Sequence, residues 1–219
     1  MIQIIENMYA SITPYDLVSS QYISLDFSKE NKKLDSVNFE DIENFNAYVF
    51  DKLAAANVKM GIGGWLENRV VYDQRTHFQG TEQRSHHLGA DIWMKAYSPI
   101  FCPENCTIHS YQNNDQNGDY GPTIILKSMA DQVFYLFGHL SIESLKGLQN
   151  RKVIKKGEHF AEIGNYPENG NWPPHLHFQV MNSMEGRSGD FPGVCSSSEL
   201  EHYKSICLNP YPFLGLNEA

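Results

Sequence analysis

The sequence predicts a mainly β fold of the α+β class, in which an antiparallel β-sheet core follows one helical segment. Three observations support this prediction. Apolar side chains recur with helical periodicity between residues 38 and 57. After Met60, short segments rich in β-branched and aromatic residues alternate with turn formers. Histidine pairs and a carboxylate stand within that second region, so we expect a functional site on the sheet.

The helical segment carries apolar residues at intervals of three and four, namely Phe39, Ile42, Phe45, Val49 and Leu53. This spacing places them on one face of a helix. Asn38 is predicted as the N-cap, because its side chain can accept hydrogen bonds from the first turn. Such a helix is expected to pack its apolar face on the β core. Before it, residues 11–15 and 22–28 permit short strands.

Strands are predicted at residues 91–97, 122–127 and 132–137, where β-branched and aromatic side chains lie between turn formers. Val70 to Tyr72 lies in the same region of strands and turns. Ser141 could cap a short helix that runs through Leu148. The polar stretch from Asp115 to Asp119 is predicted to be a hairpin loop, because it lacks the glycine and glutamate positions of a calcium loop.

The chemistry-bearing residues form three segments, His87-Leu-Gly-Ala-Asp91, Phe137-Gly-His139-Leu and His175-Leu-His177-Phe. Side chains of an extended strand alternate between its two faces, so residues two or four apart can project from one face. His86 competes with His87 as a ligand, but adjacent strand residues face opposite ways. Two histidines with one carboxylate suit a borderline-soft cation such as zinc, and three protein ligands leave a position open for water or substrate.

At these residues the chain resembles peptidase family M23, the lysostaphin and LytM type of zinc endopeptidase. The family signature is His-x-x-x-Asp, then Tyr/Phe-Gly-His-Leu, then Pro-His-Leu-His-Phe, and all three segments are present in that order. The resemblance implies that His87, Asp91 and His177 bind one zinc ion per chain. It also implies that His139 and His175 are catalytic, and that the core is lysostaphin-like, similar to a barrel-sandwich hybrid.

The resemblance covers roughly residues 60 to 182 and suggests three parts. Residues 1–60 are expected to be an N-terminal extension with the helix packed on the core, residues 61–182 the catalytic domain, and residues 183–219 a C-terminal tail. The run from Gly164 to Gln179 and the tail segment from Gly189 to Cys195 look most like M23 domains fused to aminotransferase-type proteins. Secreted wall hydrolases more often read Ser-Thr-Gly-Pro-His, so the departure puts peptidoglycan in doubt as the substrate.

The implied function is hydrolysis of a peptide (amide) bond by a metal-activated water, in a glycine-rich or D-amino-acid peptide or a peptidoglycan-like substrate. There is no His-Glu-x-x-His helix to supply a glutamate base. Imidazole titrates near neutrality, so we expect His175 to be the general base and His139 the oxyanion stabiliser. Two alternatives are a non-catalytic or regulatory zinc-binding M23-like module and a carrier-type β module.

Position alone suggests further residues near the site. Glu67, Asn68 and Arg69 precede the first motif and could contact substrate or fill the open metal position in a latent form. Four aromatic residues could frame a narrow cleft, namely Trp65, Tyr97, Tyr120 and Trp172.

Composition sets the remaining expectations. The formal charge is −9 with a pI near 5.4, which argues against nucleic acid as a partner, because a phosphate backbone demands a basic face. No stretch approaches the ~18 apolar residues of a membrane span. The first residues lack the features of a signal peptide, so a cytoplasmic location is expected, or a periplasmic or secreted one if the start is trimmed. The four cysteines are expected to be reduced thiols, and the oligomeric state is left open.

Overall fold

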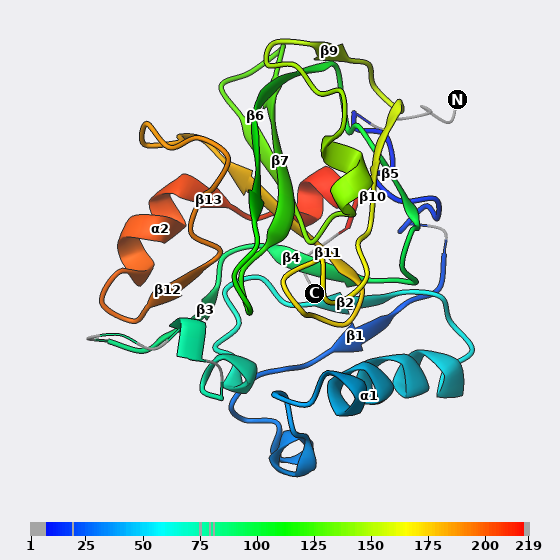
Figure 1. Ribbon diagram of the computed structural model, residues 1–219, viewed down its shortest axis with the longest axis vertical. Helices are drawn as coiled ribbons and strands as arrows, with labels where there is room; N and C mark the ends of the chain where they lie inside the picture. The colour runs from blue at the N-terminus through cyan, green and yellow to red at the C-terminus, as the bar shows by residue number, and fades with distance from the viewer. Residues whose placement is uncertain (1–7, 19, 75, 79, 81, 217–219) are drawn as a thin grey trace, which may run out of the picture.

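A large β-sheet is the centre of the molecule (Figure 1). The computed structural model describes residues 8–216 apart from 19, 75, 79 and 81, so the first residues, on which the expected location rests, lie outside it. In the described chain the strand order is β1-β2-β4-β11-β8-β7-β6-β9, with β13 also paired to β11. The strands are β1 Ile23–Leu25, β2 Gly61–Gly63, β4 Ala90–Trp93, β6 Cys106–Asn114, β7 Gly121–Ser128, β8 Phe134–Gly138, β9 Val153–Ile154, β11 His175–Met181 and β13 Cys207–Leu208. Neighbouring strands are antiparallel except for the parallel pair of β1 and β2.

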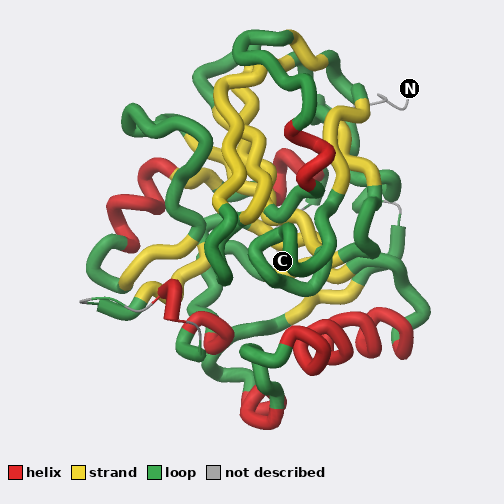
Figure 2. Tube along the Cα trace, viewed as in Figure 1, coloured by secondary structure: helices red, strands yellow, loops and turns green. Residues whose placement is uncertain are grey.

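Two small sheets and two α-helices complete the described fold (Figure 2). β3 (Arg84–His87) pairs with β12 (Val194–Ser196), and β5 (Pro99–Phe101) pairs with β10 (His159–Glu162). The helices are α1 (Ile42–Ala55) and α2 (Leu200–Ile206). Single 3₁₀ turns occupy Lys32–Ser36, Val70–Tyr72, Thr76–Phe78, Ile142–Leu145 and Tyr211–Leu214. The predicted mainly β fold of the α+β class is therefore confirmed.

The start of α1 differs from the prediction. Asp41, not Asn38, is the N-cap, and its Oδ1 accepts hydrogen bonds from the backbone N–H groups of Glu43 (3.0 Å) and Asn44 (3.3 Å). Asn38 instead accepts from the backbone N–H of Glu40 at 3.1 Å, which forms a turn before the helix. The helical periodicity was extended one turn too far, because Phe39 packs edge-to-face on Phe45 from outside the helix.

Other local predictions were only partly right. The strand expected at 91–97 ends at Trp93, and the segment 11–15 forms no strand. Val70–Tyr72 is a 3₁₀ turn within the region of predicted strands and turns. The helix expected from Ser141 to Leu148 is a 3₁₀ turn that ends at Leu145, and Gly147 in the left-handed region (φ 68°) follows it.

The two faces of the sheet have different chemistry. One face carries the main apolar core, to which β4, β8 and β11 contribute Ile92, Phe137, Leu176 and Phe178. On the other face, the register aligns one residue from each of four strands, because Gly63 pairs with Asp91, Asp91 with His177, and His177 with Gly138. Cross-strand partners share a face of the sheet. Two polar side chains therefore stand between two glycines in a single row.

Two smaller apolar clusters cover this second face on either side of the polar row. The N-terminal cluster is built around Phe27, Phe45 and Trp93 and includes the apolar side of α1. The C-terminal cluster is built around Phe191 and Cys207 and includes the buried side of α2. Figure 1 shows α1 along one edge of the molecule and α2 on a different side. The described residues before residue 61 and after residue 182 thus pack on the sheet. The expected domain boundaries at 60/61 and 182/183 stay predictions.

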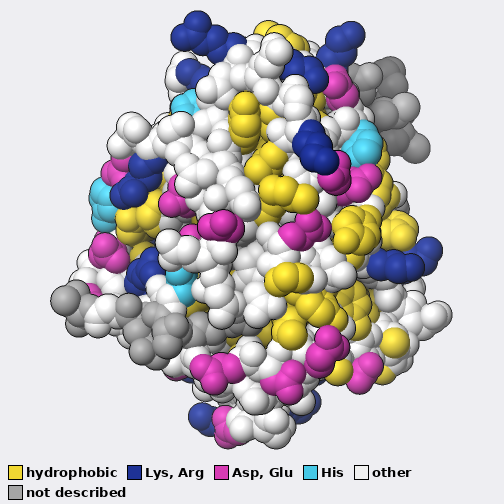
Figure 3. All heavy atoms as spheres, in the orientation of Figure 1, with side chains coloured by type: hydrophobic (Ala, Val, Ile, Leu, Met, Phe, Trp, Pro, Cys, Tyr) yellow, Lys and Arg dark blue, Asp and Glu magenta, His cyan; other side chains and the backbone are white. Residues whose placement is uncertain are grey.

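The outer surface agrees with the acidic composition. Figure 3 shows acidic side chains along the lower edge of the molecule, where α1 lies in Figure 1. Within the described part of the chain, neither α-helix combines the length and apolar character that a membrane span requires.

Truncating the central ring of the N-terminal cluster should destabilise the fold. Phe45 is 1% exposed, and its ring centroid lies 4.9–6.2 Å from those of Phe27, Phe39, Trp93 and Trp172. Phe45→Ala is expected to lower the free energy of unfolding by about 3–5 kcal/mol in urea denaturation, because a cavity replaces the ring. Asp51→Ala, on the exposed side of α1, is the control and should stay within about 0.5 kcal/mol of the parent. A loss below 1 kcal/mol would show that the cluster collapses around the missing ring.

Candidate metal centre

Three buried side chains from three strands converge on the second face of the sheet. His87 ends β3, Asp91 lies in β4, and His177 lies in β11. Their exposed fractions are 1%, 2% and 3%. His87 Nε2 lies 2.9 Å from His177 Nδ1 and 3.2 Å from Asp91 Oδ1, and His177 Nδ1 lies 3.1 Å from the same oxygen. The structure thus brings the three predicted ligands together, and the described chain offers them as a group that could hold a metal ion.

Gly64 fixes the protonation of the His87 ring. His87 Nδ1 lies 2.8 Å from the carbonyl oxygen of Gly64. A carbonyl oxygen can only accept, so Nδ1 carries the proton and donates it there. Nε2 of the neutral ring then has a free lone pair, which faces the other two ligand atoms.

Gln179 fixes the His177 ring in the opposite tautomer. The amide nitrogen of Gln179 donates to the carbonyl oxygen of Pro192 at 3.1 Å, which orients its amide oxygen towards His177. That oxygen lies 2.9 Å from His177 Nε2, so Nε2 carries the proton and Nδ1 has the lone pair. The Tyr120 hydroxyl lies 3.4 Å from the same Nε2. Both histidines therefore present lone pairs at the same point.

The spacing and protonation of the three ligand atoms suit a small divalent cation. Two lone-pair nitrogens 2.9 Å apart have no proton between them and repel each other unless a cation lies between. Ligand bonds of about 2.0–2.1 Å with tetrahedral angles separate ligand atoms by roughly 3.3 Å. The three separations seen here, 2.9, 3.1 and 3.2 Å, are close to that value. His87, Asp91 and His177 could therefore hold a small divalent ion.

A buried arginine supports the carboxylate. Arg69 Nη1 donates to Asp91 Oδ2 at 2.5 Å, and its Nε donates to Glu67 Oε2 at 2.7 Å. Burial alone would raise the pKa of Asp91, but the neighbouring His87 and Arg69 hold it well below its usual range. Arg69 also keeps its own pKa well above the usual value against the effect of burial, chiefly through Asp91. Asp91 is thus an anion at neutral pH.

His139 and His175 stand beside the triad with their second nitrogens free for chemistry. His175 Nδ1 donates to the carbonyl oxygen of Pro173, and His139 Nδ1 donates to that of Asn169, both at 2.8 Å. His175 Nε2 lies 3.8 Å from Asp91 Oδ1, and the two imidazole centroids are 4.2 Å apart. In each neutral ring Nε2 is therefore a proton acceptor.

Burial keeps these histidine rings neutral. It lowers the pKa of His87 and of His175 to about 4 and that of His139 well below its usual range. The carbonyl of Asn169 accepts the hydrogen bond from His139. The fully buried side chain of Asn169 holds this loop in place through hydrogen bonds to the backbone of Gly164 and Trp172. His139 itself has a left-handed backbone (φ 60°), which is uncommon for a residue with a side chain.

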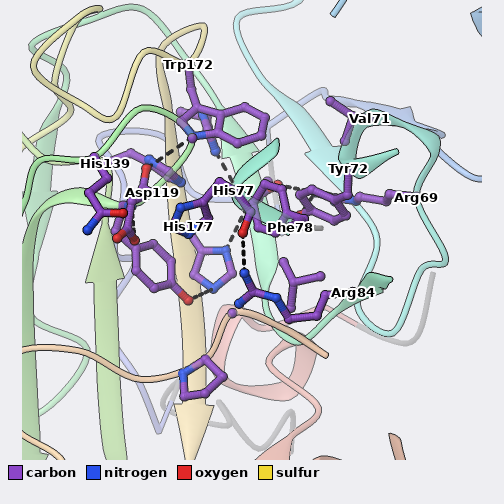
Figure 4. Close-up of a pocket in the computed structure, with 18 of the residues that line it drawn as sticks. Arg69, Val71, Tyr72, His77, Phe78, Arg84, Asp119, His139, Trp172 and His177 are labelled. Carbon is purple, nitrogen blue, oxygen red and sulfur yellow. Dashed lines mark hydrogen bonds and ion pairs between the residues drawn. The ribbon is translucent and has the colours of Figure 1, made fainter. Parts of the chain in front are cut away.

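A cavity of about 340 Å³ opens over Asp91 and His177, and His139 and His175 also line it, whereas His87 is not among its lining residues. Figure 4 shows His139 and Trp172 on one side of it, Tyr72 and Arg69 on the other, and His177 between them. Of the aromatic residues expected to frame a cleft, Tyr120 and Trp172 line this cavity, whereas Trp65 and Tyr97 do not. A cavity with aromatic walls and a few convergent polar groups is the usual form of a small-ligand site.

Some residues of the site were not predicted from the sequence. Gln179, which orients His177, follows the last motif by two residues, and the period of two along β11 could have indicated it. Tyr72 lines the cavity from a 3₁₀ turn that no local sequence pattern predicted. Glu67 and Arg69 support Asp91 through ion pairs. They do not fill the open side of the triad.

The cysteines lie away from the triad in the apolar clusters. Cys102, Cys106, Cys195 and Cys207 are all buried and form no disulfide with one another, and their reduced state stays a prediction. Cys207 Sγ accepts a hydrogen bond from Gln179 at 3.4 Å. The thiols therefore contribute packing and, in one case, a contact to the residue that orients His177.

A mainly β domain with a buried His-Asp-His cluster beside a cavity has the features of a metal-binding site. Residues 85–189, just under half of the chain, match the family model of peptidase family M23. The finer resemblance to M23 domains of aminotransferase-type proteins stays a prediction. No curated protein matches the chain.

Solved structures similar to the chain include M23-type peptidases. One is the catalytic domain of the antimicrobial peptidase lysostaphin from Staphylococcus simulans, with 22% identity over 60% of this chain and 80% of that chain and a TM-score of 0.42. The structure of LytU has 19% identity over 62% of this chain and 81% of that chain, with a TM-score of 0.41. A zinc containing peptidase from Vibrio cholerae has 18% identity over 44% of this chain and 27% of that chain, with a TM-score of 0.34.

Adjacent histidines give a matched test of the triad. His87→Ala removes one converging nitrogen, so affinity for a divalent cation should fall by more than about 100-fold, beyond the 10–100-fold typical of outer partners. His86→Ala is the control, because His86 Nε2 lies 3.0 Å from the Ser197 hydroxyl, away from the triad. Isothermal titration calorimetry with zinc measures the affinity of both variants. Equal affinities for the two variants would exclude His87 as a ligand.

Proposed function

We propose that this chain is a zinc-dependent metallopeptidase that hydrolyses a peptide (amide) bond, with one zinc ion held by His87, Asp91 and His177. The observation that carries the proposal is the convergence of two lone-pair nitrogens and one carboxylate oxygen within 3.2 Å of one another. Two further neutral imidazoles face the same cavity, and the match to the M23 family model supports a peptidase. A purely structural zinc site would more often close with a fourth protein ligand.

The zinc ion, when bound, would lower the pKa of a coordinated water towards about 7 and polarise the substrate carbonyl. The protein supplies the proton transfers. His175 Nε2, the nearer of the two free nitrogens to Asp91, accepts a proton while Nδ1 stays bonded to the Pro173 carbonyl. The same nitrogen can then return the proton to the leaving amine.

His139 is proposed to stabilise the developing oxyanion. Its Nδ1–H is already committed to the Asn169 carbonyl, so donation from Nε2 requires the imidazolium form. Burial disfavours that form in the resting site, whereas a nearby negative charge favours it. His139 would therefore take a proton from solvent in the cavity as the negative charge develops, and would return it to solvent when the oxyanion collapses, so that no net proton is consumed at this residue.

The proposed substrate is a peptide, possible targets being glycine-rich or D-amino-acid sequences such as those of peptidoglycan. A cavity of about 340 Å³ is near the lower end of the range for ligand sites, which favours a short stretch of small residues. Its aromatic walls, including Tyr72, Phe78 and Trp172, would pack against the peptide backbone.

Metal content and turnover together test the proposed function. Purified protein should contain one zinc ion per chain by elemental analysis and should cleave at least one member of a panel of pentaglycine, D-Ala-containing muropeptides and small amino-acid amides. Removal of zinc by a chelator should abolish cleavage, and added zinc should restore it. Stoichiometric zinc without cleavage of any member would favour the regulatory zinc-binding module. Absence of zinc would contradict the proposal.

The role of His139 can be separated from metal binding. His139→Ala should leave the zinc content intact and lower turnover by about 10²–10³-fold, because a group that stabilises the oxyanion is lost. His159→Ala is the control, since His159 is an exposed histidine of β10 outside the cavity. Peptide cleavage followed by mass spectrometry gives the rates, and an unchanged rate for His139→Ala would remove it from the mechanism.

A further inference from the structure

The two oxygens of Asp91 have separate partners. Oδ1 lies 3.2 Å from His87 Nε2 and 3.1 Å from His177 Nδ1, so it belongs to the triad. Oδ2 accepts the 2.5 Å hydrogen bond from Arg69 Nη1. One oxygen is thus available to a metal ion, and the other is engaged by a cation of the protein.

Arg69 is held rigidly for this contact. Its side chain is 2% exposed, its Nε donates to Glu67 Oε2 at 2.7 Å, and its backbone N–H donates to the Ser85 carbonyl at 2.9 Å. Glu67 is fixed in turn, because its Oε1 accepts from the backbone N–H of Phe27 at 2.9 Å. A planar guanidinium can bond two carboxylates along different edges, which an ammonium group does less well.

The space for Arg69 exists because β2 has a glycine opposite Asp91. A Cβ atom at Gly63 would stand 2.6 Å from Arg69 Nη2. The guanidinium therefore lies directly over the strand, next to the ligand row. Since two carboxylates already balance its charge, Arg69 is not free to bind an anionic group of a substrate.

We propose that Arg69 is a positioning residue that reserves Asp91 Oδ2 and so makes Asp91 a one-oxygen ligand. A carboxylate bound through both oxygens would occupy an additional coordination position of the ion. By holding Oδ2, Arg69 keeps that position available to water and substrate on the cavity side. This inference rests on the proposed zinc site and adds to it a residue outside the family's three motifs.

Cobalt(II) substitution tests the inference without relying on turnover. Cobalt bound to the wild-type chain should give the intense visible absorption typical of four-coordinate sites. Arg69→Met frees Oδ2 of Asp91, so both oxygens of the carboxylate can bind the ion and raise its coordination number. The visible absorption should then become weaker, while one cobalt ion per chain remains bound. Arg69→Lys keeps one donor for Oδ2 and should restore part of the intense absorption.

Arg84→Met is the matched control, because Arg84 lines the same cavity and donates to the His77 carbonyl but makes no ion pair with Asp91 in the described chain. Its cobalt spectrum should equal that of the wild type. When loaded with zinc, Arg69→Met should still bind one zinc ion per chain, and its turnover rate per bound ion should fall by about 10–100-fold. If Arg69→Met does not fold, the double variant Glu67→Gln/Arg69→Met removes both charges of the Glu67–Arg69 ion pair and should give the same spectral change.

The outcomes separate this inference from the proposed function. An unchanged cobalt spectrum in Arg69→Met, or in the double variant, would overturn the role of Arg69 even if the wild type cleaves peptides. A changed spectrum would support it even if no peptide of the panel is cleaved, a result that would count against the peptidase alone. Failure of the wild type to bind cobalt or zinc would overturn both.

Discussion

The buried carboxylate of Asp91 is the group on which the rest of the site depends. An ionised carboxylate at 2% exposure is costly unless other groups compensate its charge and fill its acceptor positions. Arg69 compensates the charge at Oδ2, and Oδ1 lies beside the nitrogens of His87 and His177, where a bound cation would compensate the rest. The orientation of both histidine rings and the burial of an arginine follow from the same requirement.

Support for the ligands comes from both flanks of the matched M23 segment. On the N-terminal side, the backbone of Phe27 holds Glu67, which holds Arg69 and thereby Asp91. On the C-terminal side, Pro192 orients Gln179, which sets the tautomer of His177. With the exception of Gln179 and the ligands, these residues lie outside residues 85–189. The regions before and after the matched segment are therefore part of the site as well as of the packing.

The sequence allowed the mainly β fold and the grouping of the five motif residues to be predicted, because both depend on short-range patterns. His175 and His177 share a face through the period of two along one strand. Arg69 and Asp91 are 22 residues apart and meet only through the pairing of β2 with β4, which no local pattern specifies. The N-cap error has a similar cause. Asn38 and Asp41 are both good caps, and packing of Phe39 from outside the helix decides between them.

The left-handed backbone of His139 lowers the stability of the fold at a residue whose side chain is proposed to take part in catalysis. Holding a residue with a side chain in this region costs about 1 kcal/mol or more, a cost that glycine would largely avoid. Glycine would relieve this conformational cost but would also delete the buried ring, its hydrogen bond to Asn169 and its contacts with Trp172 and His175. The imidazole is therefore kept at a backbone position that is intrinsically unfavourable for it, and its contacts must offset that cost.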